Sequence, residues 1–149
     1  MRPFLCAVLA LCALAFTSCH STGPAGGGND AEVRTFLEHY FSTWSDQDMD
    51  AYGKCFSDQA RISFIDRGQV MSQGTIDFLH GQRMAHQQSS VRMNEKPLEM
   101  KIQGDDHVKQ AAVTWVLKKE GGEQHGTDFF TLQHDGNQWK IVALVFYGD

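Results

Sequence analysis

The chain has 149 residues, of which 18 are acidic and 13 basic, so its formal charge is -5. This length suits one domain with an appendage, and the 42% hydrophobic and 21% charged fractions exclude a wholly disordered chain. Nucleic-acid-binding proteins usually carry a basic patch or run, and the sequence contains none. No apolar run reaches the ~18 residues of a confident membrane-spanning helix, so composition favours a small acidic globular domain.

The N-terminus has the three parts of an export signal. Arg2 precedes a continuous apolar stretch from Phe4 to Phe16, and small residues follow it. A charged start, a short apolar core and a small-residue end are typical of a secretory signal peptide. The block FTSC, which ends at Cys19, resembles the lipobox of bacterial lipoproteins, in which cleavage occurs before a cysteine that carries a diacylglyceryl group. Leu is usual in such motifs where Phe16 stands here.

This resemblance implies a signal peptide at residues 1–18 and a lipidated Cys19. Residues 19–30 then form the lipidated end and a flexible, Gly-rich linker. Stable anchoring needs more than one acyl chain, which a triacylated cysteine provides. We therefore expect export and a lipid anchor in the bacterial cell envelope, on the outer face of the cytoplasmic membrane or at the outer membrane. The alternative is ordinary secretion with cleavage near Ser18.

Residues 31–149 are predicted to form one α+β domain in which helices precede a run of antiparallel strands. An apolar stripe at helical spacing predicts a first helix that begins at Asp30. A second, short helix is expected from Asp48, with Phe56 on its apolar face. The remaining predicted elements are strands at 60–66 and 70–71, a third helix at 75–88, and strands at 93–103, 108–119, 126–134 and 139–147. Pro97 indicates an edge strand or a bulge.

Two segments of this domain resemble the nuclear transport factor 2-like superfamily. They are TFLEHYFSTWSDQDMDAYGKCFSDQARISFID and, near the C-terminus, HDGNQWKIVALVFYG. The superfamily includes ketosteroid isomerase, scytalone dehydratase and the SnoaL-like polyketide cyclases, and the resemblance covers about residues 31–148. It implies a cone-like, curved antiparallel or mixed sheet wrapped around the long first helix, with an apolar pocket. Because this fold hosts enzymes, binding modules and oligomerisation domains, it does not specify a function.

Ketosteroid isomerases need a carboxylate base and two hydrogen-bond donors, a tyrosine and a protonated aspartic acid. By resemblance, Tyr40 falls on the donor tyrosine and Asp128 on the second donor. The base position falls on Phe64, which cannot accept a proton, and Asp66 lies two residues further with the same side-chain parity. The resemblance thus implies a donor pair without its base, which argues against isomerase activity.

The pattern and the resemblance together define a set of expected ligand-binding residues, with no catalytic residue assigned. His80 belongs to this set because dehydratase and cyclase relatives use pocket histidines, a role for which His39 and His86 are also candidates. The alternative is that the aromatic members simply fill the cone as core. The set is Tyr40, Trp44, Phe64, Asp66, His80, Trp115, Asp128, Phe130 and Tyr147.

We therefore expect a lipoprotein whose domain binds a small apolar or amphipathic ligand. The alternatives are a cofactor-independent lyase, isomerase or cyclase acting on a carbonyl compound, and a non-catalytic interaction or dimerisation module. The sequence lacks HExxH, CxxC and His pairs at i, i+4, and no cofactor or metal is implied. The expected partners are a small molecule, the membrane through Cys19 and, because relatives commonly dimerise through the convex sheet face, a second copy of the chain. Cys55 is interpreted as a small core residue rather than a nucleophile.

Overall fold

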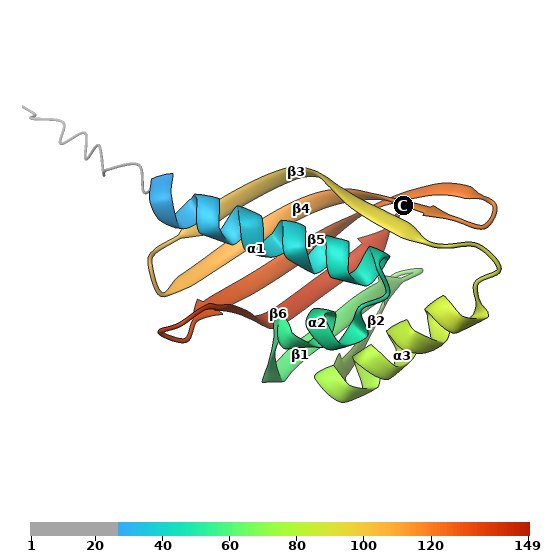
Figure 1. Cartoon of the computed structure of the whole chain (residues 1–149), viewed down its shortest axis with the longest axis horizontal. Coiled ribbons are helices and arrows are strands. Elements are labelled where there is room, and N and C mark those ends of the chain that lie inside the picture. The colour runs from blue at the N-terminus through green and yellow to red at the C-terminus, as the bar shows by residue number, and fades with distance from the viewer. Residues whose placement is uncertain (1–26) are drawn as a thin grey trace, which may run out of the picture.

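The structure is a computed structural model that describes residues 27–149, so the predicted signal peptide, Cys19 and the first part of the linker lie outside the described residues. Figure 1 shows the described helices and strands. They are α1 (Gly27–Ser45), α2 (Met49–Lys54), β1 (Phe56–Asp66), β2 (Gln69–Gly74), α3 (Thr75–Gln88), β3 (Asn94–Gly104), β4 (Val108–Lys119), β5 (Gly122–His134) and β6 (Trp139–Gly148). None of the described helices is long and apolar enough to cross a membrane.

The strands form one sheet in the order β2-β1-β6-β5-β4-β3. All neighbouring pairs are antiparallel except β1 and β6, which run parallel. The family resemblance implied an antiparallel or mixed sheet and did not indicate which pair would be parallel. β1 and β6 lie at opposite ends of the domain sequence, so no hairpin forces them to be antiparallel. The curved mixed sheet with three helices confirms the predicted α+β cone.

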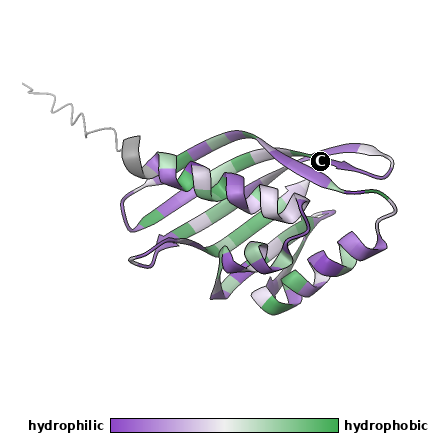
Figure 2. Ribbon diagram, viewed as in Figure 1, coloured by the Kyte–Doolittle hydropathy of each residue, from purple (hydrophilic) through white to green (hydrophobic). Residues whose placement is uncertain are grey.

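The long helix α1 lies across one face of the sheet, over β3, β4 and β5 (Figure 1). Its side chains Val33, Leu37 and Phe41 are almost completely buried against inward residues of the strands, such as Val113 and Leu132. Hydrophobic and hydrophilic bands alternate along the strands (Figure 2), as expected when only one face of a sheet is covered. The core therefore sits between α1 and the concave face of the sheet.

Several element boundaries differ from the prediction, most clearly those of α1, α2, β1 and β5. Phe56 begins β1 instead of ending α2, because Cys55 caps α2 and its carbonyl accepts a hydrogen bond from the Ile141 amide of β6 at 2.8 Å. Helix α1 begins at Gly27, within the expected linker, and β5 begins four residues before Gly126.

Pro97 predicted an edge strand or a bulge, and the structure contains both. β3 is one of the two edge strands of the sheet, and its pairing with β4 shifts register between Pro97 and Glu99. Proline has no amide hydrogen to donate, so an edge position with a bulge accommodates it.

Candidate ligand-binding site

A cavity of about 190 Å³ lies between the concave face of the sheet and the three helices. Pockets that hold drug-sized ligands are about 300–1,000 Å³, whereas benzene occupies an engineered cavity of about 150 Å³, so this cavity suits a compound of one or two rings. The side that reaches solvent is marked by lining residues that are partly or fully exposed, namely Gln82, Glu95, Leu117, Gln124, Phe146 and Gly148. The other lining residues are Tyr40, Trp44, Tyr52, Phe78, Trp115 and Asp128.

The end of α1 fixes the position of Glu95 on β3. The Ser45 hydroxyl donates to the Glu95 carbonyl at 3.0 Å and accepts from the Glu95 amide at 2.9 Å. Arg92, just before β3, donates to the Ser45 carbonyl and pairs with Asp46 at 2.7 Å. The last turn of the helix is thereby joined to the strand at the residue whose carboxyl group lines the cavity.

Asp128 is held by Trp115 on the neighbouring strand. Trp115 of β4 lies directly opposite Gly126 of β5, where a Cβ would overlap the indole ring and the Tyr147 carbonyl. The missing side chain lets the indole lie against β5, so that Nε1 donates to Oδ1 of Asp128 at 2.6 Å. A glycine at this position is therefore part of the geometry of the site.

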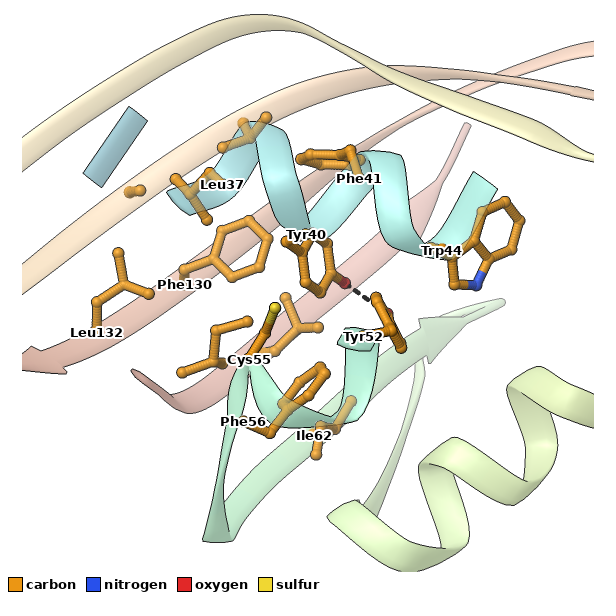
Figure 3. Close-up of a cluster of buried hydrophobic side chains, with 14 of the residues drawn as sticks. Leu37, Tyr40, Phe41, Trp44, Tyr52, Cys55, Phe56, Ile62, Phe130 and Leu132 are labelled. Atoms are coloured by element: carbon orange, nitrogen blue, oxygen red, sulfur yellow. Dashed lines mark hydrogen bonds between the residues drawn. The ribbon is translucent and has the colours of Figure 1, made fainter. Parts of the chain in front are cut away.

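Two tyrosines from different helices meet at the cavity. The Tyr52 hydroxyl of α2 donates to the Tyr40 hydroxyl of α1 at 2.9 Å, as the dashed line in Figure 3 shows. Behind Tyr40, Phe130 packs edge-to-face with a centroid distance of 5.2 Å. Because Tyr40 accepts this bond, its own hydroxyl hydrogen remains available to a group inside the cavity.

Trp44, one turn after Tyr40 on α1 (Figure 3), connects α1 to α3. Its indole Nε1 donates to Oε1 of Gln82 at 2.7 Å, and both residues line the cavity. The walls thus combine aromatic faces with a few oriented polar groups, the usual composition of a small-molecule site.

Burial changes the acidity of the polar groups in the cavity. It raises the pKa of Asp128 to about 7, although the Trp115 hydrogen bond acts in the opposite direction. Burial, followed by the charge of Asp128, raises the pKa of Glu95 well above its ordinary value. Burial likewise raises the pKa of Tyr40 and of Tyr52. Two like charges in one cavity disfavour each other, so the Glu95–Asp128 pair retains a proton near neutral pH.

The cavity lining contains two carboxyl groups and no Lys, Arg or His. An anionic ligand would therefore find only repulsive formal charges there, whereas neutral and cationic ligands would not. This charge distribution restricts the class of ligand more strongly than the shape of the cavity does.

Four of the residues predicted from the sequence line the cavity together, namely Tyr40, Trp44, Trp115 and Asp128. Phe130 instead belongs to the core, where it is 2% exposed and packs behind Tyr40.

The other predicted residues lie outside the cavity. Phe64 stacks on Phe146 at 5.9 Å between centroids, and only Phe146 of the two lines the cavity. Asp66 is exposed at the end of β1, 3.8 Å from Arg67. Tyr147 corrects the prediction most clearly, because it follows Phe146 on β6 and therefore points to the opposite face.

None of the candidate histidines lines the cavity. His80 and His39 are exposed on α3 and α1. His86 is buried and lies against Trp44 with ring centroids 4.3 Å apart, but it is not among the residues that line the cavity. Among residues 27–149, no group of His, Cys, Asp and Glu could hold a metal ion.

Sequence reasoning missed Glu95, Tyr52 and Gln82 as lining residues. Tyr52 lies on the buried face of the short helix α2, where a tyrosine usually belongs to the core. Glu95 lies two residues after the buried Met93, so strand alternation places both side chains on the inner face of the sheet. The register shift of β3 comes only after Glu95, between Pro97 and Glu99. Nothing in the local pattern around Gln82 indicates its contact with Trp44, because that contact depends on how α3 packs.

Residues 28–147 match the model of a protein family described as "Putative lumazine-binding". The chain belongs to this family. No curated protein matches it.

Solved structures show the same fold. A nuclear transport factor 2-like protein of unknown function from Pseudomonas putida is 12% identical with a TM-score of 0.68, over 78% of this chain and 84% of that one. A Novosphingobium aromaticivorans protein described as a "Putative Scytalone Dehydratase" is 10% identical with a TM-score of 0.69, over 80% and 83%. A Mycobacterium tuberculosis protein of unknown function is 19% identical with a TM-score of 0.69, over 87% and 78%. These likenesses establish the nuclear transport factor 2-like fold and leave function to the site.

Proposed function

We propose that the domain binds a small amphipathic compound, neutral or cationic, in the cavity beneath α1. One observation carries this proposal: aromatic walls surround oriented polar groups in a cavity of about 190 Å³ that contains no basic residue. A filled core would leave no such space, and a site for an anion would supply a positive charge.

The polar groups have distinct roles in this proposal. Tyr40 donates its hydroxyl hydrogen to an oxygen of the ligand, because it already accepts from Tyr52. To a neutral ligand, a protonated Asp128 donates a second hydrogen bond, while its Oδ1 stays bonded to Trp115. The rings of Trp44 and Phe146 pack against the apolar body of the ligand.

The test is a titration followed by tryptophan fluorescence, since Trp44 and Trp115 line the cavity. The probes are cyclohexanol, phenol and lumazine, the last because the family description contains its name. We expect saturable binding of at least one probe. Tyr40→Phe should weaken it by about tenfold, equivalent to one lost hydrogen bond. The matched control Tyr147→Phe, on the other face of the sheet, should leave it unchanged. Absence of saturation by all probes would contradict the proposal.

A second candidate function is proton transfer at a carbonyl compound without a cofactor. The observation that favours it is the Glu95–Asp128 pair, since carboxyl groups with raised pKa in a cavity are typical of acid–base sites. The test is exchange of the α-hydrogens of cyclohexanone in D2O, followed by NMR. Exchange that is faster with the protein and slower with Glu95→Gln would support an enzyme, and exchange at the buffer rate would exclude this reaction for this compound.

We also propose that the domain is anchored in the bacterial cell envelope through a lipidated Cys19. The basis is the lipobox-like sequence that ends at Cys19 after a charged start and an apolar stretch. The test is the intact mass of the protein from host membranes. We expect a chain that begins at Cys19 with added acyl groups, and a Cys19→Ser variant without them. A mature chain without lipid would contradict the anchor.

A further inference from the structure

We propose that the ligand of this cavity is a protonated amine, held by the carboxyl groups of Glu95 and Asp128 among aromatic rings. This inference rests on the proposed binding function and names its ligand class. It follows from three features of the site: two acidic side chains, no basic side chain and aromatic faces on several sides.

The carboxyl oxygens have capacity that the protein leaves unused. Trp115 donates to Oδ1 of Asp128, and no described residue donates to Oδ2. The bonds of Glu95 to Ser45 involve only the Glu95 backbone, so its carboxyl group accepts none from the described residues. Asp128 is 4% exposed and Glu95 is half-buried, and neither carboxyl group is among the side-chain atoms sealed from solvent without a partner. Their free oxygens therefore face the cavity, where water or a ligand can bond to them. A primary ammonium group has three hydrogens to donate and matches this arrangement.

Among the described residues, no cationic side chain serves as a counter-ion for Glu95 and Asp128. Lys109 is buried, but it pairs with Asp30 at 2.5 Å and does not line the cavity. Lys119 is exposed and donates to the side chain of Gln124 at 2.5 Å, near the side of the cavity that reaches solvent. The two acids therefore face the cavity without an internal counter-ion in the described part of the chain.

The aromatic walls add a second attraction for a cation. Tyr40, Trp44 and Trp115 line the same space as the two acids. Tryptophan and tyrosine faces attract ammonium groups, and the attraction strengthens where water is removed. The rings also bury the hydrocarbon part of an amine, which an inorganic cation lacks.

Cation binding should exchange a proton for the ligand. The empty pair of acids keeps a proton because two adjacent negative charges would repel each other, and the other ionisable groups lining the cavity are the neutral phenols of Tyr40 and Tyr52. A bound ammonium group supplies the missing positive charge and favours ionisation of both acids. Binding of an amine should therefore release protons, whereas binding of an alcohol should not.

The experiment is isothermal titration calorimetry of the full chain with three probes that share one ring: cyclohexylammonium, cyclohexanol and cyclohexanecarboxylate. We expect cyclohexylammonium to bind at least about tenfold more tightly than cyclohexanol, and the carboxylate not to bind. Repetition in two buffers of different ionisation enthalpy should show proton release with the amine only. If cyclohexanol binds as tightly as the amine, the cation inference is wrong while the binding function stands. If none of the three binds, the proposed function itself fails.

The acids are tested by matched variants on one strand. Glu95→Gln should remove most of the preference for cyclohexylammonium over cyclohexanol and reduce the released protons, while cyclohexanol binding persists and shows that the cavity is intact. Glu99→Gln makes the same change of charge at an exposed position of β3 and should keep the preference. An unchanged preference in Glu95→Gln would overturn the assignment.

Discussion

At the scale of single residues, Asp128 determines the chemistry of the cavity. Its neighbour Trp115 fixes one oxygen, and burial keeps the acid close to its point of ionisation at neutral pH. The hydrogen bond between Trp115 and Asp128 depends on Gly126, because a side chain at this position would overlap the indole ring. The site thus depends on a residue that has no side chain.

The raised pKa of Asp128 predicts how stability depends on pH. The folded protein holds this proton more tightly than the unfolded chain, so folding gains from it at low pH and loses that gain as pH rises from 3.8 to about 7. Three pKa units correspond to at most about 4 kcal/mol, so we expect the free energy of unfolding to fall by roughly 2–4 kcal/mol over this interval. Urea unfolding at several pH values measures it.

Asp128→Asn serves as the comparison for that pH series, since an amide oxygen still accepts from Trp115. The variant should lose much of the slope between pH 4 and 7, whereas Asp66→Asn, at an exposed position, should keep it. Equal slopes in the wild type and Asp128→Asn would show that the pH dependence of stability does not come from Asp128.

Gly126→Ala should displace the indole of Trp115 and break its bond to Asp128. We expect a loss of about 1–3 kcal/mol in unfolding free energy and a shifted tryptophan emission. Gly81→Ala is the matched control, because a Cβ there meets no atom within 4 Å and the helix gains roughly 0.5–1 kcal/mol. A stable Gly126→Ala protein with unchanged emission would refute this view of the site.

At the scale of elements, the docking of α1 onto the sheet builds the cavity. The helix is held at its end by the hydrogen bonds of Ser45 to Glu95 of β3, and near its start by the ion pair between Asp30 and Lys109 of β4. The Lys109 side chain is 5% exposed, and its other hydrogen-bond acceptor is the Gly104 carbonyl at 3.4 Å. The two attachments lie at opposite ends of the helix, so each should contribute independently to the free energy of unfolding.

Asp30→Asn should leave the buried ammonium group of Lys109 with weak compensation. We expect a loss of roughly 1–3 kcal/mol in unfolding free energy, measured by urea unfolding. Glu38→Gln removes a charge from the exposed face of the same helix and should change stability by less than about 0.5 kcal/mol. Similar effects of both variants would mean that the ion pair does not secure the helix.

Periodicity and turn residues predicted most of the elements, since each depends on neighbours in the sequence. The helix stripe that contains Tyr40 and Trp44, and the strand alternation that contains Trp115, are local patterns of this kind, whereas Asp128 was expected from the family resemblance. The parallel pairing of β1 with β6 joins distant segments and has no local signal. The same reason explains Glu95, whose inward position depends on Ser45 fifty residues earlier in the chain. Tyr147 was misplaced because the register shift in β6 reverses its parity relative to Ile141.

At the scale of the whole molecule, the outer face of the sheet is the surface most suited to a second copy of the chain. Phe129 is 46% exposed there and stacks with Tyr147 at 6.3 Å, and Val145 lies on the same face. We propose a homodimer through this face. Analytical ultracentrifugation should show a dimer that Phe129→Lys converts to a monomer, while Val70→Lys, at the exposed β2 edge, should remain dimeric. A monomeric wild type would contradict the dimer.

The cavity beneath α1 connects all three scales, because its lining comes from every described element except β1 and β2. The most direct measurement is a native mass spectrum of the protein purified from its own host. We predict a bound small molecule with one or two rings and an amino group, lost when Asp128 and Glu95 are replaced by their amides. A protein that is empty in this spectrum, and whose cavity also binds no hydrophobic dye, would contradict a ligand site and favour an interaction module.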